Sequence, residues 1–103
     1  MSLFLHRFKG KALYLLDEPE SALSPSRQLV FQRVLRELTD RQAQFIIATH
    51  SPILLGYPDA TIYRFDEEKI TDIEYDMPEH VQITKYFLLN REKILEELWK
   101  DER

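Results

Sequence analysis

Two apolar runs with an amphipathic stretch between them form the strongest pattern in the chain. The runs predict strands over residues 12–16 and 44–48, and their continuous hydrophobicity indicates strands buried on both faces, as in a parallel sheet covered by helices. Between them, Val30, Val34 and Leu38 recur at helical spacing. Because Ser24-Pro25 is a typical helix start, a helix is predicted over residues 25–41. Strand, helix and strand together indicate a right-handed βαβ unit.

Weaker patterns flank this unit. Residues 3–8 predict the last turns of a helix, which Gly10 would end. Alternating apolar positions on either side of a polar turn predict a hairpin with one wet face over residues 60–75. Apolar positions at helical spacing predict helices over residues 78–102. With no repeat or linker along the sequence, we expect one α/β unit spanning residues 1–103.

Composition narrows the class of protein. The chain is 44% hydrophobic and 31% charged, as in ordinary globular domains, and its net charge of -4 gives no general attraction to nucleic acid, which leaves a nucleic-acid partner open. No apolar run approaches the roughly 20 residues that span a bilayer. The absence of cysteine excludes disulfides and thiolate metal sites, and it fits the cytoplasmic location that we expect.

Chemically useful side chains follow both predicted parallel strands. Asp17 and Glu18 end the first strand, and His50 follows the second. Ligands of open α/β sheets bind beyond the carboxyl ends of the strands, so these side chains are expected to converge there. Adjacent carboxylates suit magnesium–phosphate chemistry, in which one can hold the ion and the other can polarise a water. A histidine opposite them could contact the terminal phosphate.

Each of these signals has a simpler interpretation when taken alone. An Asp-Glu-Pro sequence is more often a turn than a site, and a single histidine is usually structural or solvated. His6 and His80 are interpreted in that way. Glu20 is interpreted as a surface or capping carboxylate that could also adjust the site indirectly, through the residues that contact the ligand. The functional reading therefore depends on the combination and order of the residues.

The ordered motifs resemble those of ATP-binding-cassette (ABC) and related chromosome-maintenance ATPases. Residues 13–18 (LYLLDE) resemble the Walker B motif, residues 21–24 (SALS) the D-loop, and residues 47–51 (IATHS) the switch-histidine loop. Residues 8–53 are similar to small bacterial ATPases of the AAA/ABC-like class, and the tail over residues 79–90 resembles their C-terminal end. The resemblance implies a partial P-loop NTPase sheet that carries the βαβ unit, the hairpin and the C-terminal helices.

The resemblance also implies a role for each matching residue. Asp17 would hold Mg²⁺, Glu18 would polarise the attacking water, and His50 would contact the γ-phosphate of ATP. The partners would be ATP and either a second copy or a missing N-terminal half. The D-loop would reach the partner's nucleotide across a head-to-tail dimer through Ser21, Ala22, Leu23 and Ser24.

One departure from the family is large. With glycine only at positions 10 and 56, the sequence contains no Gly-x-x-x-x-Gly-Lys-Ser/Thr phosphate-binding loop, and the Q-loop and signature motif are missing too. We therefore expect a shortened product, a truncated gene or half of a split protein, inactive alone. Two alternatives stay open: a self-associating interaction module, and a stand-alone metal-dependent hydrolase using Asp17, Glu18 and His50. The process that ATP would drive, whether transport, DNA repair or defence, also stays open.

Overall fold

The computed structural model describes the backbone of residues 2–8 and all atoms of residues 11–100. The chain divides into two compact units, Met1–Ala60 and Thr61–Arg103, where the sequence predicted one. The boundary falls just before the predicted hairpin, so the hairpin and the C-terminal helices form a unit separate from the βαβ part. Each unit is described by itself below.

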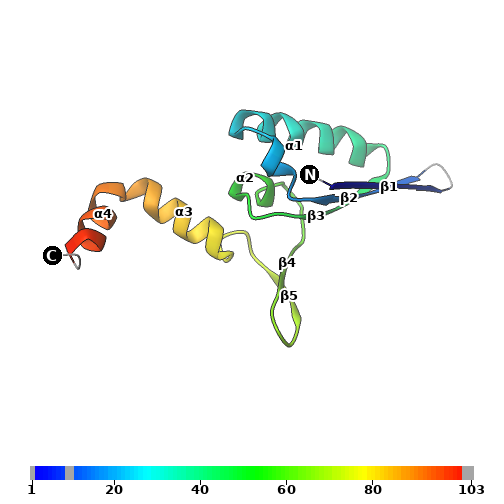
Figure 1. Ribbon diagram of the computed structural model, residues 1–103. Coiled ribbons are helices and arrows are strands. Elements are labelled where there is room, and N and C mark those ends of the chain that lie inside the picture. Colours follow the sequence, from blue (N-terminus) through cyan, green and yellow to red (C-terminus); the bar gives the residue numbers. More distant parts are fainter. Residues whose placement is uncertain (1, 9–10, 101–103) are drawn as a thin grey trace. The chain divides into compact units, whose positions relative to one another are not determined.

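The first unit is built on a three-stranded sheet with the order β1-β2-β3. Strand β2 (Lys11–Asp17) pairs in parallel with β3 (Ala43–Ala48), and helix α1 (Pro25–Asp40) connects them. These elements form the predicted βαβ unit (Figure 1). Their register places Asp17 beside Ala48, so both strands end at the same edge of the sheet.

The first strand corrects the sequence prediction. Residues 3–8 are not the end of a helix but lie in β1 (Ser2–Phe8), which runs antiparallel to β2 from Ser2↔Asp17 to Phe8↔Lys11. Pairing with β2 gives the backbone groups of this short apolar segment partners that a few isolated helical turns would not supply. Gly10, which was expected to end the helix, lies outside the described residues.

Helix α1 begins where its sequence signals place it. The Ser24 side chain accepts a 3.3 Å hydrogen bond from the backbone N–H of Arg27, and Pro25 occupies the first turn, where its missing N–H is not needed. The helix ends at Asp40, after which Gln42 takes a left-handed backbone conformation with φ of 69°. The chain thus reverses into β3 within two residues.

Helices α1 and α2 (Pro52–Leu55) lie on one side of the sheet (Figure 1). On the covered face Leu16 is 7% exposed and Leu35 of α1 is 3% exposed. The Tyr14 and Phe45 rings stack there with their centroids 4.6 Å apart.

The opposite face of the sheet is open. Side chains alternate along a strand, and Leu15 and Ile46, which are register partners, are 36% and 56% exposed. The prediction that both strands are buried on both faces is therefore wrong for this chain. The burial of residues 43–48 alternates along β3 instead, because helices cover only one face.

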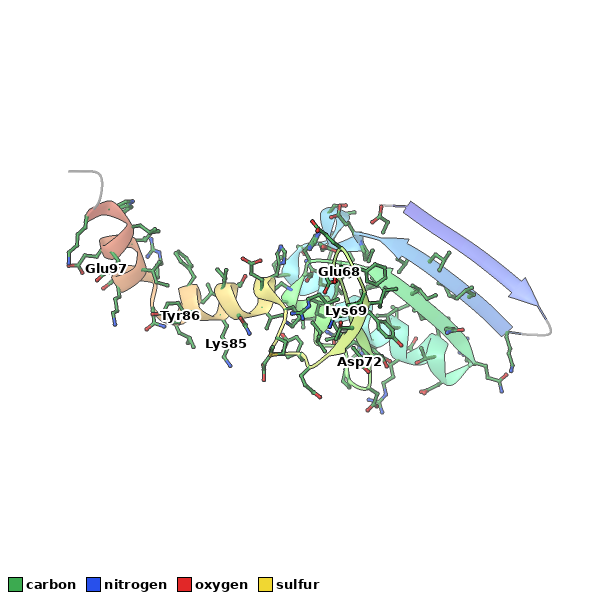
Figure 2. All side chains as sticks on the ribbon, turned by 90° about the horizontal axis from the view of Figure 1, so that it is seen from below. Glu68, Lys69, Asp72, Lys85, Tyr86 and Glu97 are labelled. Carbon is green, nitrogen blue, oxygen red and sulfur yellow. The ribbon has the colours of Figure 1, made fainter. Side chains whose placement is uncertain are left out.

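The second unit contains a hairpin and two helices. Strands β4 (Ile62–Phe65) and β5 (Ile70–Ile73) pair antiparallel, and the helices are α3 (Glu79–Leu89) and α4 (Arg91–Lys100). Figure 2 labels residues of the hairpin, Glu68, Lys69 and Asp72, and others on the two helices. Among the helices of the described chain, none has the length and apolar character needed to cross a membrane.

The turn of the hairpin is organised by one carboxylate. Asp66 Oδ1 accepts hydrogen bonds from the backbone N–H groups of Glu68, at 3.0 Å, and Lys69, at 2.9 Å. These two bonds lower the pKa of Asp66 from its ordinary value. One face of the hairpin is wet as predicted, but it carries apolar side chains, since Phe65 and its register partner Ile70 are 74% and 62% exposed.

Candidate functional site

Strand β2 ends in a sharp change of backbone direction at the two adjacent carboxylates. The backbone N–H of Glu18 donates to the carbonyl of Ala48 at 2.7 Å, which extends the pairing with β3 one residue beyond Asp17. Glu18 itself is left-handed, with φ of 47° and ψ of 55°. A left-handed conformation costs a non-glycine residue about 1–2 kcal/mol. It turns the chain into a 3₁₀ turn, η1 (Pro19–Ala22), whose Pro19 is fully buried.

The residues that follow β3 bring His50 to this turn. His50 Nε2 lies 3.7 Å from Glu18 Oε1, and the two side chains are 64% and 55% exposed. The structure therefore brings Glu18 and His50 together, as the strand ends predicted. Because both side chains face solvent, a bound molecule could reach them.

Asp17 lies next to this pair without forming a metal site with it. It is exposed at the last position of β2, and strand alternation places it on the same face as Leu15. In the described ranges, no cluster of three or more histidine, aspartate or glutamate side chains could hold a metal ion by itself. Any ion at Asp17 would need oxygen ligands from a bound molecule or from water.

Glu20 joins η1 to the residues after β3 through both of its carboxylate oxygens. Oε1 accepts from the Thr49 hydroxyl at 2.6 Å, and Oε2 accepts from the backbone N–H of His50 at 2.9 Å. Partial burial raises the pKa of Glu20, but these two hydrogen bonds, a third from its own backbone N–H and the nearby His50 together outweigh it, and the pKa falls below its ordinary value. The sequence interpretation, a surface or capping carboxylate that could also adjust the site, did not identify the two partners of this bridge.

The expected D-loop residues form an exposed connection between η1 and α1. Ser21 and Ala22 are in η1, Leu23 follows it, and Ser24 caps α1. Only Leu23 is half-buried, while the other three side chains are exposed. This segment belongs to the unit that carries Glu18 and His50, and a partner molecule could reach it.

A buried hydrogen-bond network lies behind these loops. Gln28 of α1 donates through Nε2 to the carbonyl of Leu23 at 3.1 Å, and its Oε1 accepts from the Ser51 hydroxyl. The Ser51 oxygen also caps α2, since it accepts from the N–H groups of Ile53 and Leu54. Sequence reasoning missed this network; the one local signal that could have indicated it is Ser51-Pro52, which has the form of a helix start.

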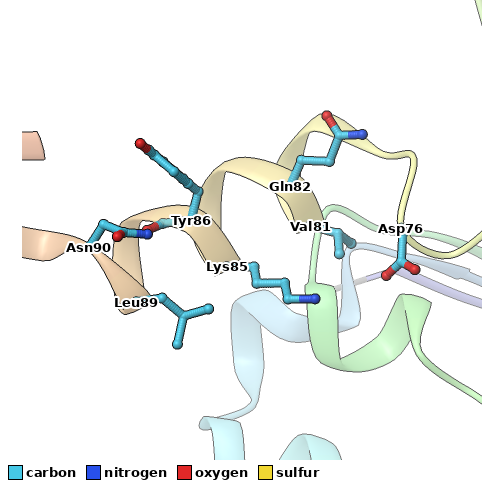
Figure 3. Close-up of a pocket in the computed structure, with 7 residues that line it drawn as sticks. All are labelled: Asp76, Val81, Gln82, Lys85, Tyr86, Leu89 and Asn90. Atoms are coloured by element: carbon cyan, nitrogen blue, oxygen red, sulfur yellow. The ribbon is translucent and has the colours of Figure 1, made fainter.

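A separate pocket lies in the second unit. Its volume is about 300 Å³, and it contains none of the predicted site residues. Figure 3 shows its lining, which comes from α3 and the residues that flank it: Asp76, Val81, Gln82, Lys85, Tyr86, Leu89 and Asn90. It is open and at the lower limit of ordinary ligand pockets, so the strand ends of the first unit remain the better candidate site.

Comparison with known proteins identifies the first unit. A family model described as "AAA domain, putative AbiEii toxin, Type IV TA system" matches residues 2–56. The matched segment includes both parallel strands, α1 and the Glu18–His50 pair. No curated protein and no solved structure matches the chain. Since the matched residues make up more than half of the sequence, the chain belongs to this family of AAA domains, whose general function is nucleotide binding of the ATPase type.

Proposed function

We propose that this chain supplies the Walker B, D-loop and switch-histidine half of an ABC-type ATPase. The observation that carries the proposal is the 3.7 Å approach of His50 Nε2 to Glu18 Oε1 at the ends of two adjacent parallel strands. In such a site Glu18 polarises the attacking water and His50 contacts the γ-phosphate. Most catalysis of phosphoryl transfer is positioning and charge stabilisation, which requires few protein groups.

The donor set at the end of β2 fits the Mg²⁺ that accompanies ATP. Mg²⁺ prefers oxygen ligands and commonly takes one or two carboxylates together with phosphate oxygens. Asp17 offers an exposed carboxylate at this position, and the cation would neutralise charge on the phosphate oxygens. Asp17 would hold the ion, largely through water, which leaves Glu18 available for the attacking water.

A second polypeptide surface would complete the nucleotide-binding site. The sequence has no phosphate-binding loop, so we propose that the chain alone binds ATP weakly and does not hydrolyse it. The exposure of Ser21, Ala22 and Ser24 supports a contact of this segment with a partner's nucleotide. That partner is an N-terminal half that carries the phosphate loop, or a second copy joined head-to-tail with such a half.

The test combines the chain with an upstream segment that carries a phosphate-binding loop and measures phosphate release. Hydrolysis should require Mg²⁺, and Glu18→Gln should lower its rate about 10²–10⁴-fold while binding of a slowly hydrolysed ATP analogue persists. Glu67→Gln, at an exposed carboxylate of the hairpin, is the matched control. Normal hydrolysis by the Glu18→Gln variant would sink the assignment.

A second candidate function is self-association without catalysis. The observation that favours it is the open face of the sheet, where Leu15 and Ile46 lie side by side and exposed. Uncovered apolar faces of this kind favour burial against another surface. Light scattering of the chain should then show a dimer or larger species that Ile46→Lys converts to monomer, and a strictly monomeric chain at high concentration would exclude this function.

A further inference from the structure

The loop that carries His50 is held by a single carboxylate from the other side of the site. Thr49 and His50 follow directly after β3, and Glu20 accepts from the Thr49 hydroxyl at 2.6 Å and from the His50 N–H at 2.9 Å. The Thr49 oxygen in turn accepts from the N–H of Ser51 at 3.0 Å. Glu20 thus holds Thr49 and His50 directly, and the Thr49 hydroxyl links it to Ser51.

This arrangement links the two members of the Glu18–His50 pair. Glu18 and Glu20 belong to the same turn, whose geometry is set by the left-handed Glu18 and the 3.0 Å bond from the Ser21 N–H to the Glu18 carbonyl. The His50 side chain is 64% exposed, so packing around the imidazole does little to set its direction. Its approach to Glu18 therefore also requires a fixed backbone at His50, which Glu20 supplies through the bond from the His50 N–H.

A carboxylate suits the chemistry of this bridge. Both donors, a hydroxyl and a backbone N–H, point at Glu20, and an ionised carboxylate offers an acceptor oxygen to each. A glutamine of the same shape would offer one oxygen to the His50 N–H, and its NH₂ group could only donate to the Thr49 hydroxyl, so the bridge would lose its charge and one bond would reverse. Hydrogen bonds to an ionised group are also shorter and stronger than neutral ones, which agrees with the 2.6 Å distance to Thr49.

We propose that Glu20 is a positioning residue, which fixes the backbone of Thr49 and His50 so that the His50 imidazole faces Glu18. The proposal rests on the proposed function in assigning Glu18 and His50 to ATP. Glu20 would not touch the nucleotide itself. It would act by keeping the γ-phosphate contact and the water-polarising carboxylate at a fixed separation.

Nuclear magnetic resonance of the whole chain tests this positioning without ATP. Glu20→Ala should make exchange of the His50 backbone amide roughly ten- to hundredfold faster, because its charged acceptor is removed. It should also remove the Overhauser contact between the His50 imidazole and the Glu18 side chain. Amide signals of β2 and α1 report in the same spectra whether the fold is intact, and Glu67→Ala is the control substitution.

Substitutions at Thr49 provide a second measurement. Thr49→Val removes the hydroxyl at nearly constant shape and should loosen His50 in the same direction, while Thr49→Ser keeps the hydroxyl and should restore the exchange rate and the contact. Unchanged exchange and an unchanged contact in folded Glu20→Ala or Thr49→Val would overturn the proposal. Neither readout depends on nucleotide, so a failed hydrolysis assay would count against the proposed function alone.

Discussion

The Ser51 hydroxyl donates a hydrogen bond to Gln28 Oε1, and both residues are only 7% exposed. This bond joins the start of α2 to the first turns of α1. Gln28 also donates to the carbonyl of Leu23, so the amide connects the segment before α1 to the segment after β3. A second side chain of α1 also connects this helix to α2, because Gln32 Nε2 donates to the carbonyl of Ile53 at 2.6 Å.

We expect Gln28→Leu to lower the free energy of unfolding by about 1–3 kcal/mol, because it leaves the Leu23 carbonyl and the Ser51 hydroxyl without their partner. Ser51→Ala should be destabilising as well, since it also removes the cap of α2. The double variant should cost less than the sum of the two single variants, because one shared bond is counted twice. Urea unfolding followed by circular dichroism gives all the values. Strict additivity would mean that the two side chains are not coupled.

The open and covered sides of α1 should respond very differently to the same substitution. Leu35 is 3% exposed and Leu29 is 60% exposed, although both belong to the same helix. Leu35→Ala should lower the free energy of unfolding by about 2–5 kcal/mol through lost burial and a cavity. Leu29→Ala should change it by no more than about 0.5 kcal/mol, since the site is on the surface. Similar losses at both positions would show that another surface covers Leu29 in solution.

Capping of α1 gives a local test of the same unit. Ser24→Ala removes the side-chain acceptor for the Arg27 N–H and should cost about 1 kcal/mol. Ser24→Asp keeps an acceptor and adds a negative charge at the helix N-terminus, so it should preserve the stability. Amide exchange at Arg27 distinguishes the two variants. If Ser24→Ala leaves the exchange unchanged, the cap contributes nothing to α1.

The elements that the sequence predicted are those with a local signal. Helix α1 shows both an apolar stripe and a Ser-Pro start, and β2 and β3 show short apolar runs that end in polar residues. The approach of His50 to Glu18 also followed from a general rule, because the carboxyl ends of parallel neighbours meet at one edge.

The remaining features depend on contacts between distant parts of the chain. Residues 3–8 fit a helical turn as well as a strand, and only pairing with β2 decides between them. The bond from Thr49 to Glu20 spans 29 residues, and nothing local to Glu20 distinguishes a bridging carboxylate from a solvated one. The sequence also does not predict the open face of the sheet, because an apolar strand has the same sequence whether helices cover one face or both.

Glu20 should also make the first unit sensitive to acid. Its pKa in the folded chain is lower than the ordinary value of 4.5 that the unfolded chain has, so the unfolded state binds more protons over the interval between the two values. Glu20 therefore contributes its full stabilisation above about pH 4.5. This contribution is lost as the pH falls through the pKa that Glu20 has in the folded chain.

Measuring the free energy of unfolding against pH for the wild-type chain and for Glu20→Gln tests this effect. Glu20→Gln should be less stable at neutral pH, and the difference should shrink below about pH 4.5, where the wild-type carboxyl becomes protonated. Asp66→Asn is the matched control, because the pKa of Asp66 is also lowered but by backbone bonds within the hairpin turn. Amide exchange of Leu16 in β2 should follow Glu20 and not Asp66. Equal acid sensitivity at Leu16 in the wild-type chain and in Glu20→Gln would show that the Glu20 bridge contributes nothing to the unit that carries His50.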